Sequence, residues 1–341
     1  MPPSADPASS RAKLADVAAL ADVSVSTVSK VLNGRSGVSE DTRARIEALL
    51  QGQRYNRRTP SVRNAMLLEV LCYEIDSPFA GEAVSSIERV CADRGIGMVL
   101  SSATTEHLPP AGWSASVLKR QPIGVLLVAA RLPDADRERL RSRGVPVVLV
   151  DPAGTPALGV PTIGSADWNG AFLATRHLLD LGHRDIAIIT GPDDMLASTA
   201  RLSGYRAALD AARVTIDPAF VRPGQFHYAD GLTQGRVLLT GARRPTAVFA
   251  SSDLQALGVY EAARRLGLSV PADLSVVGYD DLQIAQWAGP PLTTIRVPLS
   301  EMAEQAAHLA LRLRDEPELA FSRIDVATSL VVRESTAPPA S

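Results

Sequence analysis

The sequence has few cysteines, few aromatic residues and no long apolar run. Its two cysteines, Cys72 and Cys91, stand far apart among 341 residues, so we expect neither a disulfide framework nor a cysteine metal site. No stretch approaches the roughly 20 apolar residues that cross a bilayer. The opening residues, MPPSADPASSRAK, lack the apolar segment of a signal peptide. We therefore expect a soluble cytoplasmic protein with no membrane partner.

The motifs of common catalytic sites are missing as well. The sequence contains no HxxxH or CxxC spacing and no GxSxG or GxxxxGK[ST] motif. Its five histidines are scattered along the chain: His107, His177, His183, His227 and His308. We predict that the protein is not an enzyme and has no catalytic residues, no metal site and no cofactor.

The positive charge is concentrated near the N-terminus. Residues 11–64 hold ten Lys and Arg against five Asp and Glu, although the whole chain has a net charge of −2. The remainder is therefore net acidic, and only the N-terminal part should favour a polyanion such as DNA. The length itself predicts two or three domains.

Residues 14–33, LADVAALADVSVSTVSKVLN, have the apolar pattern of two short helices joined by a tight turn. Asp22 suits the left-handed conformation of such a turn, and Ser24 suits the N-cap of the second helix. Two apolar faces follow helical spacing: Leu14, Val17, Ala18 and Ala21, then Val28, Val31 and Leu32. A third helix is predicted from the N-cap Ser39, with an apolar stripe at Ile46, Leu49 and Leu50.

The outward face of the second helix is short, polar and nearly free of acid. It carries Val25, Ser26, Ser29, Lys30 and Asn33. Such side chains can approach phosphates and base edges in a DNA major groove. The alternative is an ordinary helical hairpin that shows this face to water.

From Leu67 onward, short apolar runs alternate with helical stretches, which predicts an α/β architecture with parallel sheets. Two sheets of about six strands fit the count. The candidate strands are 67–75, 96–103, 124–130, 146–151, 185–191, 247–253 and 274–280. The candidate helices are 79–94, 134–143, 168–181, 198–212, 254–266 and 300–314.

Residues just beyond such strands are natural ligand contacts, because the carboxyl ends of parallel strands face a crevice. Asp151 and Asp280 end two strands, and carboxylates suit vicinal hydroxyls. Arg201 can donate as a fork, while Phe79 and Phe226 offer flat faces to a sugar ring. The alternatives are turn or helix caps for the aspartates and core positions for the phenylalanines. Asp253 is expected to cap the helix that begins at Leu254, and Trp168 and Trp287 are weaker candidates.

Both halves resemble the lactose-repressor (LacI/GalR) family. ADVAALADVSVSTVSKVLNG, VSEDTRARI and Tyr55 resemble its DNA-binding headpiece. RHLLDLGHRDIAIITG, PTAVFASSDLQALGVYEAARRLGLSVPADLSVVGYDD and TSLVVREST resemble its effector-binding core, so the resemblance covers about residues 12–335. Asp22 replaces the usual turn Gly, Ser252 replaces a frequent Asn, and the hinge segment is shorter and lacks the family's Leu.

The resemblance implies a three-helix helix-turn-helix headpiece joined to a two-lobed core like a periplasmic binding protein. We expect a disordered N-terminus at 1–10, the headpiece at 11–55, a linker at 56–64, the core at 65–335 and a tail at 336–341. Thr59 and Pro60 suit the start of a short hinge helix, and a flexible linker is the alternative. Lobe 1 should span about 65–162 and 293–322, and lobe 2 about 163–292 and 323–335.

The resemblance also assigns the contacts. Val25, Ser26 and Lys30 would read bases, and Ser24, Thr27, Ser29 and Asn33 would hold phosphates. Arg57 and Arg58 are expected to meet phosphate or the minor groove. Effector contacts would come from Phe79, Asp151, Arg201, Phe226 and Asp280.

The implied function is transcription regulation by a homodimeric, allosteric repressor of carbohydrate-utilisation genes. It would bind pseudo-palindromic double-stranded operator DNA in the nucleoid and leave it when a mono- or oligosaccharide fills the cleft. The alternatives are a sugar-binding protein without DNA function and a sugar-processing enzyme on the same scaffold.

Overall fold

The computed structural model describes residues 14–32, 38–52, 66–316, 319 and 323–340. The chain divides into two compact units, Met1–Asn64 and Ala65–Ser341. Among the described residues, no helix combines the length and the apolar character that a bilayer span needs.

The first unit contains three helices: α1 (Leu14–Leu20), α2 (Val25–Leu32) and α3 (Glu40–Gly52). The predicted turn and caps are confirmed. Asp22 has a φ of +49°, and the Oγ atoms of Ser24 and Ser39 accept hydrogen bonds from Thr27 N at 3.2 Å and Thr42 N at 3.4 Å. A small apolar cluster holds the helices together: Val17, Ala18, Ala21, Val28, Val31 and Ile46.

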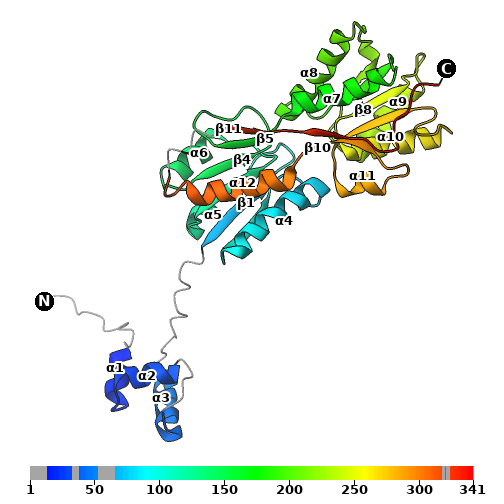
Figure 1. Ribbon diagram of the computed structural model, residues 1–341. Helices are drawn as coiled ribbons and strands as arrows, with labels where there is room; N and C mark the ends of the chain where they lie inside the picture. The colour runs from blue at the N-terminus through cyan, green and yellow to red at the C-terminus, as the bar shows by residue number, and fades with distance from the viewer. Residues whose placement is uncertain (1–13, 33–37, 53–65, 317–318, 320–322, 341) are drawn as a thin grey trace, which may run out of the picture. The chain divides into compact units, whose positions relative to one another are not determined.

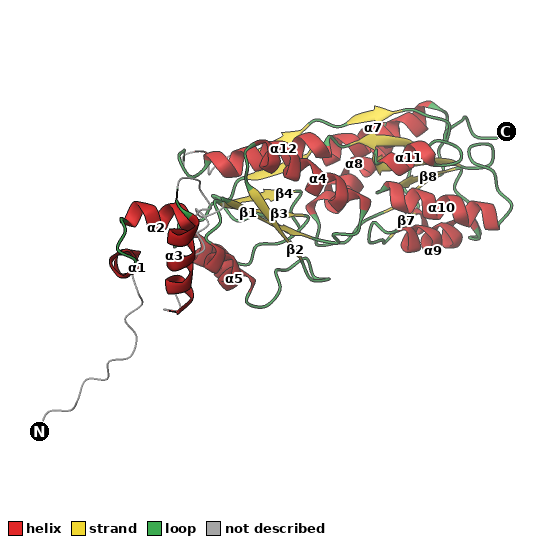
Figure 2. Ribbon diagram, turned by 90° about the horizontal axis from the view of Figure 1, so that it is seen from below, coloured by secondary structure: helices red, strands yellow, loops and turns green. Residues whose placement is uncertain are grey.

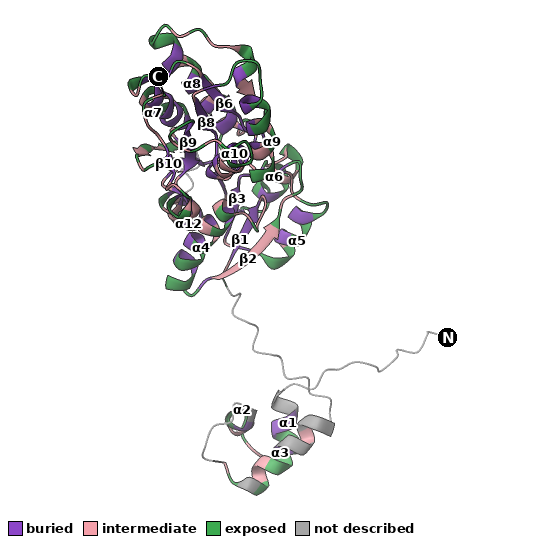
Figure 3. Ribbon diagram, turned by 90° about the vertical axis from the view of Figure 1, so that its right-hand side faces the viewer, coloured by how far each residue is buried: buried purple, intermediate pink, exposed green. Residues whose placement is uncertain are grey.

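The first lobe of the second unit is built on a six-stranded parallel sheet in the order β11-β5-β4-β3-β1-β2. Its strands are β1 (Leu67–Cys72), β2 (Gly97–Ser102), β3 (Gly124–Val128), β4 (Val147–Val150), β5 (Thr162–Ser165) and β11 (Arg323–Val326). Its helices are α4 (Pro78–Asp93), α5 (Trp113–Arg120), α6 (Asp134–Arg141) and α12 (Leu299–Arg312). The edge strand β2 is less buried than its neighbours (Figure 3).

Helices cover both faces of this sheet (Figure 2). Leu126 and Val128 of β3 join a core cluster with α4 and α12. The alternate residues Val125 and Leu127 join another cluster with α5 and α6. The strand therefore buries both of its faces, which explains the unbroken apolar run GVLLV in a parallel sheet.

The second lobe also has a six-stranded sheet, in the order β12-β10-β9-β8-β6-β7, so the prediction of two sheets of about six strands is confirmed. Only β12 is antiparallel among the described pairs of this sheet. The strands are β6 (Ile186–Ile189), β7 (Val221–Arg222), β8 (Ala247–Ala250), β9 (Ser275–Asp280), β10 (Thr293–Arg296) and β12 (Ser329–Val331). The helical elements are α7 (Asp167–Asp180), α8 (Leu196–Ala211), η1 (Pro218–Phe220), α9 (Tyr228–Leu239), α10 (Asp253–Arg265) and α11 (Gln283–Trp287).

Glycines allow two helix pairs of this lobe to approach closely. A Cβ atom on Gly204 of α8 would lie 2.2 Å from the carbonyl oxygen of Trp168 of α7. A Cβ atom on Gly258 of α10 would lie 2.3 Å from the carbonyl oxygen of Tyr228 of α9. Both contacts are with backbone, which cannot move aside as a flexible side chain can.

The chain crosses between the lobes three times, and each crossing falls later than predicted. The predicted crossings, near Thr162, near Thr293 and near Ser322, fall a few residues early because each strand completes its ladder before the chain leaves the sheet. β5 pairs with β4 and β11 in the first sheet, and β10 pairs with β9 in the second. The C-terminal segment, dark red in Figure 1, runs along the first sheet as β11 and then enters the second as β12.

The core also extends past its predicted end at residue 335. Ala337 N donates a hydrogen bond to Ser275 Oγ at 3.0 Å, and Ala337 O lies 2.8 Å from Nε2 of the buried His183. The start of the predicted tail is therefore fixed to the second lobe.

Candidate functional site

The predicted DNA-reading residues lie on the exposed face of α2, with Val25 and Ser26 in its first turn and Lys30 in its last. Val25 keeps 47% of its surface exposed, and Ser26 and Lys30 are also exposed. Ser24 Oγ lies 2.7 Å from Ser26 Oγ and 2.8 Å from Thr27 Oγ1, which forms a small hydroxyl cluster beside the helix start. Hydroxyls and free amides at a helix N-terminus suit phosphate oxygens.

Part of the predicted DNA surface is not described. Asn33, Arg57, Arg58 and the rest of the 56–64 linker lie outside the described residues, as does the side chain of Ser29. Their assigned contacts remain predictions.

All five predicted effector residues line one pocket between the lobes of the second unit. The pocket measures about 680 Å³, including its opening to solvent. Each side chain comes from a different part of the chain. Phe79 lies on α4, Asp151 follows β4, Arg201 lies on α8, Phe226 precedes α9 and Asp280 ends β9.

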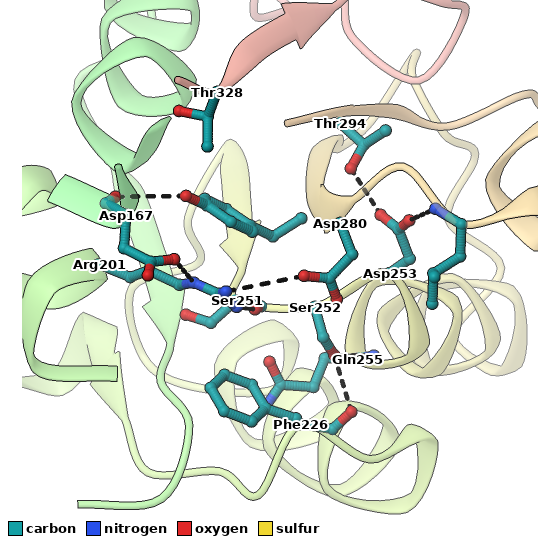
Figure 4. Close-up of polar contacts among 12 residues, drawn as sticks. Asp167, Arg201, Phe226, Ser251, Ser252, Asp253, Gln255, Asp280, Thr294 and Thr328 are labelled. Atoms are coloured by element: carbon teal, nitrogen blue, oxygen red, sulfur yellow. Dashed lines mark hydrogen bonds and ion pairs between the residues drawn. The ribbon is translucent and has the colours of Figure 1, made fainter. Parts of the chain in front are cut away.

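Arg201 is the buried charge at the centre of this site (Figure 4). Its Nε donates to Asp167 Oδ1 at 2.8 Å and its Nη1 donates to the carbonyl oxygen of Ser251 at 2.6 Å. Its Nη2 lies 3.7 Å from Asp280 Oδ1, and its guanidinium carbon lies 3.8 Å from the ring centroid of Tyr279. This arrangement holds the fork rigidly in the pocket wall.

The carboxylates of the pocket lie in a poorly solvated environment. Burial raises the pKa of Asp151 from 3.8 to about 7; Asp167 adds to the shift and Arg201 opposes it. Burial also raises the pKa of Asp280 well above its ordinary value, and Arg201 again opposes this. Asp280 Oδ1 is buried near Arg201 Nη2 and receives no hydrogen bond from the described residues, which leaves an acceptor of the pocket wall unsatisfied.

Six non-glycine residues of the pocket have left-handed backbone conformations. They are Glu74, His107, Ala129, Asp151, Phe226 and Asp280, with φ from +46° to +107°. Such conformations are costly for residues with a Cβ and cluster at ligand sites. Four of them turn the chain at or just after a strand end, Phe226 does so before α9, and His107 lies between β2 and α5.

Ser252, and not Asp253 as predicted, caps α10. Ser252 is the N-cap of α10: its Oγ accepts from Gln255 N at 3.1 Å and donates to the carbonyl oxygen of Phe226 at 2.7 Å. The expectation that Asp253 caps the helix is wrong, because Asp253 is the first helical residue. It is buried and accepts from Leu282 N at 2.8 Å and Thr294 Oγ1 at 2.6 Å. It thereby fixes Leu282, which lines the pocket.

Sequence reasoning missed several pocket residues. The pocket lining also includes Tyr73, Glu74, His107, Gln225 and His227. Asp167 accepts a hydrogen bond from Arg201 and so helps to hold the guanidinium in place. Asp167 follows β5 as Asp151 follows β4, but β5 reads TIGS and has no apolar run to mark its end in the sequence. The two tryptophan candidates lie outside the pocket lining: Trp287 is 70% exposed and Trp168 stacks on Phe172.

Known proteins match both units. Residues 13–57 match the family described as "Bacterial regulatory proteins, lacI family", and residues 175–336 match the "Periplasmic binding protein-like domain". The ribose operon repressor of Escherichia coli (strain K12) is 34% identical over 335 residues, covering 95% of this chain and 99% of the relative.

Two solved structures are similar over nearly the whole chain. A "transcriptional regulator CelR-cellobiose complex" is 35% identical with a TM-score of 0.72, covering 95% of this chain and all of that one. The lac repressor dimer bound to operator and the anti-inducer ONPF is 28% identical with a TM-score of 0.73, covering 96% and 100% of the two chains.

Proposed function

This chain belongs to the lacI family of bacterial regulatory proteins, and from that premise we propose a repressor whose effector is a small sugar. The observation that carries the proposal is the convergence of five side chains from both lobes on one pocket. Carboxylates and an arginine fork suit hydroxyls, and Phe79 and Phe226 suit the faces of a sugar ring.

The relatives support a carbohydrate as the effector. One is named for a ribose operon and another was solved with cellobiose. For this chain we propose a mono- or oligosaccharide that contacts Phe79, Asp151, Arg201, Phe226 and Asp280. Ligand binding would favour one arrangement of the two lobes, which is the differential affinity that allostery requires.

We propose that two copies of the chain place their headpieces on a pseudo-palindromic operator. The base contacts would come from Val25, Ser26 and Lys30. The other contacts would come from Ser24, Thr27, Ser29, Asn33, Arg57 and Arg58. Dimerisation would involve α4 and residues 254–290, and the protein would act in the cytoplasm on the nucleoid. The relatives are regulators rather than enzymes, and we assign no catalytic role to the pocket.

The proposal is tested by comparing the full chain with a variant that lacks residues 1–64. The full chain should select a palindromic sequence from random DNA and release it in the presence of one sugar from a panel. The truncated variant should remain dimeric and bind the same sugar without DNA affinity, because the basic, DNA-facing unit is gone. Mobility-shift assays, sedimentation and calorimetry provide these readings.

Retained DNA binding by the truncated variant would contradict the assignment of DNA binding to residues 1–64. A full chain that binds sugar but selects no DNA sequence would instead support the alternative, a sugar-binding protein without DNA function.

A further inference from the structure

The two lobes touch each other directly at the edge of the pocket through Glu74 and His227. Glu74 Oε1 of the first lobe lies 2.8 Å from His227 Nε2 of the second, and both residues line the pocket. Each partner is held by its own lobe. Ser77 N donates to the carbonyl oxygen of Glu74 at 2.8 Å, and His227 N donates to Asp230 Oδ1 at 2.8 Å.

A second group of contacts between the lobes surrounds Asp194. Its carbonyl oxygen accepts a hydrogen bond from Gly154 N at 2.7 Å, and its Oδ2 lies 3.5 Å from Nδ1 of the buried His107. An isolated β-bridge joins Ala153 to Met195 immediately beside it. These backbone contacts hold the two lobes together beside the pocket.

One aromatic contact connects the two groups. The ring of Tyr73 lies 4.1 Å from the ring of His107, between centroids, and Tyr73 is the chain neighbour of Glu74. We call Tyr73, Glu74, His107, Asp194 and His227 the rim. The chain crossings that act as hinges, after β5, β10 and β11, use none of these residues.

The pocket lining also contains one aromatic ring from each lobe. Phe79 of the first lobe and Phe226 of the second pack against the same small apolar cluster of Ala129, Ala153 and Met195. A ring bound here would meet Phe79, Phe226 and the polar group around Arg201. Glu74 and His227 line the same pocket, so a second ring that reached past Phe79 and Phe226 toward them would meet their contact.

We infer that the contact between Glu74 and His227 limits the effector to a single sugar ring. This inference rests on the proposed function and specifies the size of the effector. The relatives leave that size open, since ribose names one and cellobiose accompanies another at nearly equal identity. At 2.8 Å no atom fits between Glu74 Oε1 and His227 Nε2, so a ligand that extends between these two side chains must separate them.

The test compares sugar affinities of the full-length protein and its rim variants by titration calorimetry. The probes are single pentoses and hexoses, including ribose, and disaccharides, including cellobiose. The wild type should bind one of the monosaccharides and discriminate against disaccharides that contain it by about 10-fold to 200-fold, the range that pocket size usually gives. Glu74→Ala and His227→Ala should each reduce that ratio by about tenfold or more.

Two further variants separate a size limit from a loss of structure. Glu74→Gln keeps the side-chain length and an acceptor for His227, so it should retain the wild-type ratio. Asp76→Ala removes an exposed carboxylate two residues away, outside the pocket lining, and should also retain it. Because the readout is a ratio of two affinities, a general weakening of the fold does not mimic the expected result.

Three outcomes would overturn the inference. A wild type that binds a disaccharide as tightly as a monosaccharide excludes the limit while leaving the sugar-responsive repressor in place. An unchanged ratio in Glu74→Ala and His227→Ala assigns the limit to other residues. A wild type that binds no sugar of either size rejects the proposed effector class and the limit with it.

Discussion

The two candidate sites of this protein differ in how the chain builds them. The predicted DNA contacts from Ser24 to Lys30 lie within one short stretch, and those with described side chains are exposed or half-buried. The pocket residues come from many elements between β1 and Leu282, and its charged centre at Arg201 is buried. One site is local and solvent-exposed, and the other is assembled from segments that lie far apart in the sequence.

The difference follows from the size of the ligand. DNA is larger than the headpiece, so its contact surface can stay hydrated until the duplex arrives. A small ligand gains affinity only when it is mostly surrounded, so its polar contacts must be placed in a desolvated wall. The carboxyl groups of Asp151 and Asp280 in that wall have raised pKa values, and several wall residues have left-handed backbone conformations. The exposed face of α2 needs neither feature.

The substitution Arg201→Ala is expected to have the largest effect, and to change the pocket without changing the DNA-binding unit. Arg201→Ala removes the buried partner of Asp167 and Asp280 and should lower the free energy of unfolding of the core by about 3 to 5 kcal/mol. It should also abolish sugar binding and the response to sugar. Operator affinity without sugar should stay within a few fold, because the headpiece forms a separate unit.

Thermal melting, sugar titration and mobility-shift assays measure these three quantities. Arg176→Ala is the matched control. Its exposed pair with Asp180, 3.1 Å apart, should be worth about 0 to 1 kcal/mol. Normal sugar affinity in Arg201→Ala would show that the buried fork does not contact the effector.

A smaller effect is expected on the local site. Lys30→Ala should cost about 1 to 3 kcal/mol at one base step and relax specificity there, if its exposed amine reads a base edge. Binding to selected and random sequences is compared at fixed salt. Arg45→Ala removes an exposed cation from α3 and serves as the control. An equal loss on both kinds of DNA would make Lys30 a phosphate contact.

The contrast between the sites also explains what the sequence alone could predict. The turn at Asp22, the caps at Ser24 and Ser39 and the exposed face of α2 depend on neighbours in the chain, and the described parts were predicted correctly. The strand ends Asp151 and Asp280 were found for a similar reason. An apolar run followed by a carboxylate is a local pattern.

The missed features depend on tertiary contacts. β5 reads TIGS and β10 reads TTIR, so neither has an apolar run, yet ladders with neighbouring strands fix both. α9 contains Gly231 and Gly235, which lower its helix propensity, and close packing on α10 compensates. The pairing of Glu74 with His227 joins residues from different lobes, so no spacing in the sequence could reveal it.

The smallest expected effect is a pH dependence that only the buried site should show. Burial raises the pKa of Asp151 from 3.8 to about 7, so this carboxyl is mostly protonated at about pH 6 and mostly ionised at about pH 8. The ionised form accepts stronger hydrogen bonds from sugar hydroxyls. Sugar affinity should therefore rise with pH across this window, by at most about tenfold per unit.

Stability should change in the opposite direction. The pKa of Asp151 is about 7 in the folded protein and 3.8 ordinarily. Between these two pH values the folded protein therefore holds a proton that the unfolded chain has lost. The contribution of Asp151 to the free energy of unfolding is thus greatest below that window and declines as the pH rises through it.

Calorimetric titration with sugar and melting curves of the ligand-free protein, both at about pH 6 and about pH 8, separate the two trends. Asp151→Asn should reduce both slopes, leaving the part that comes from Asp280 and the other buried carboxyls. A wild-type affinity that falls with pH would mean that the protonated carboxyl donates to the sugar, and it would reverse the role assigned to this residue.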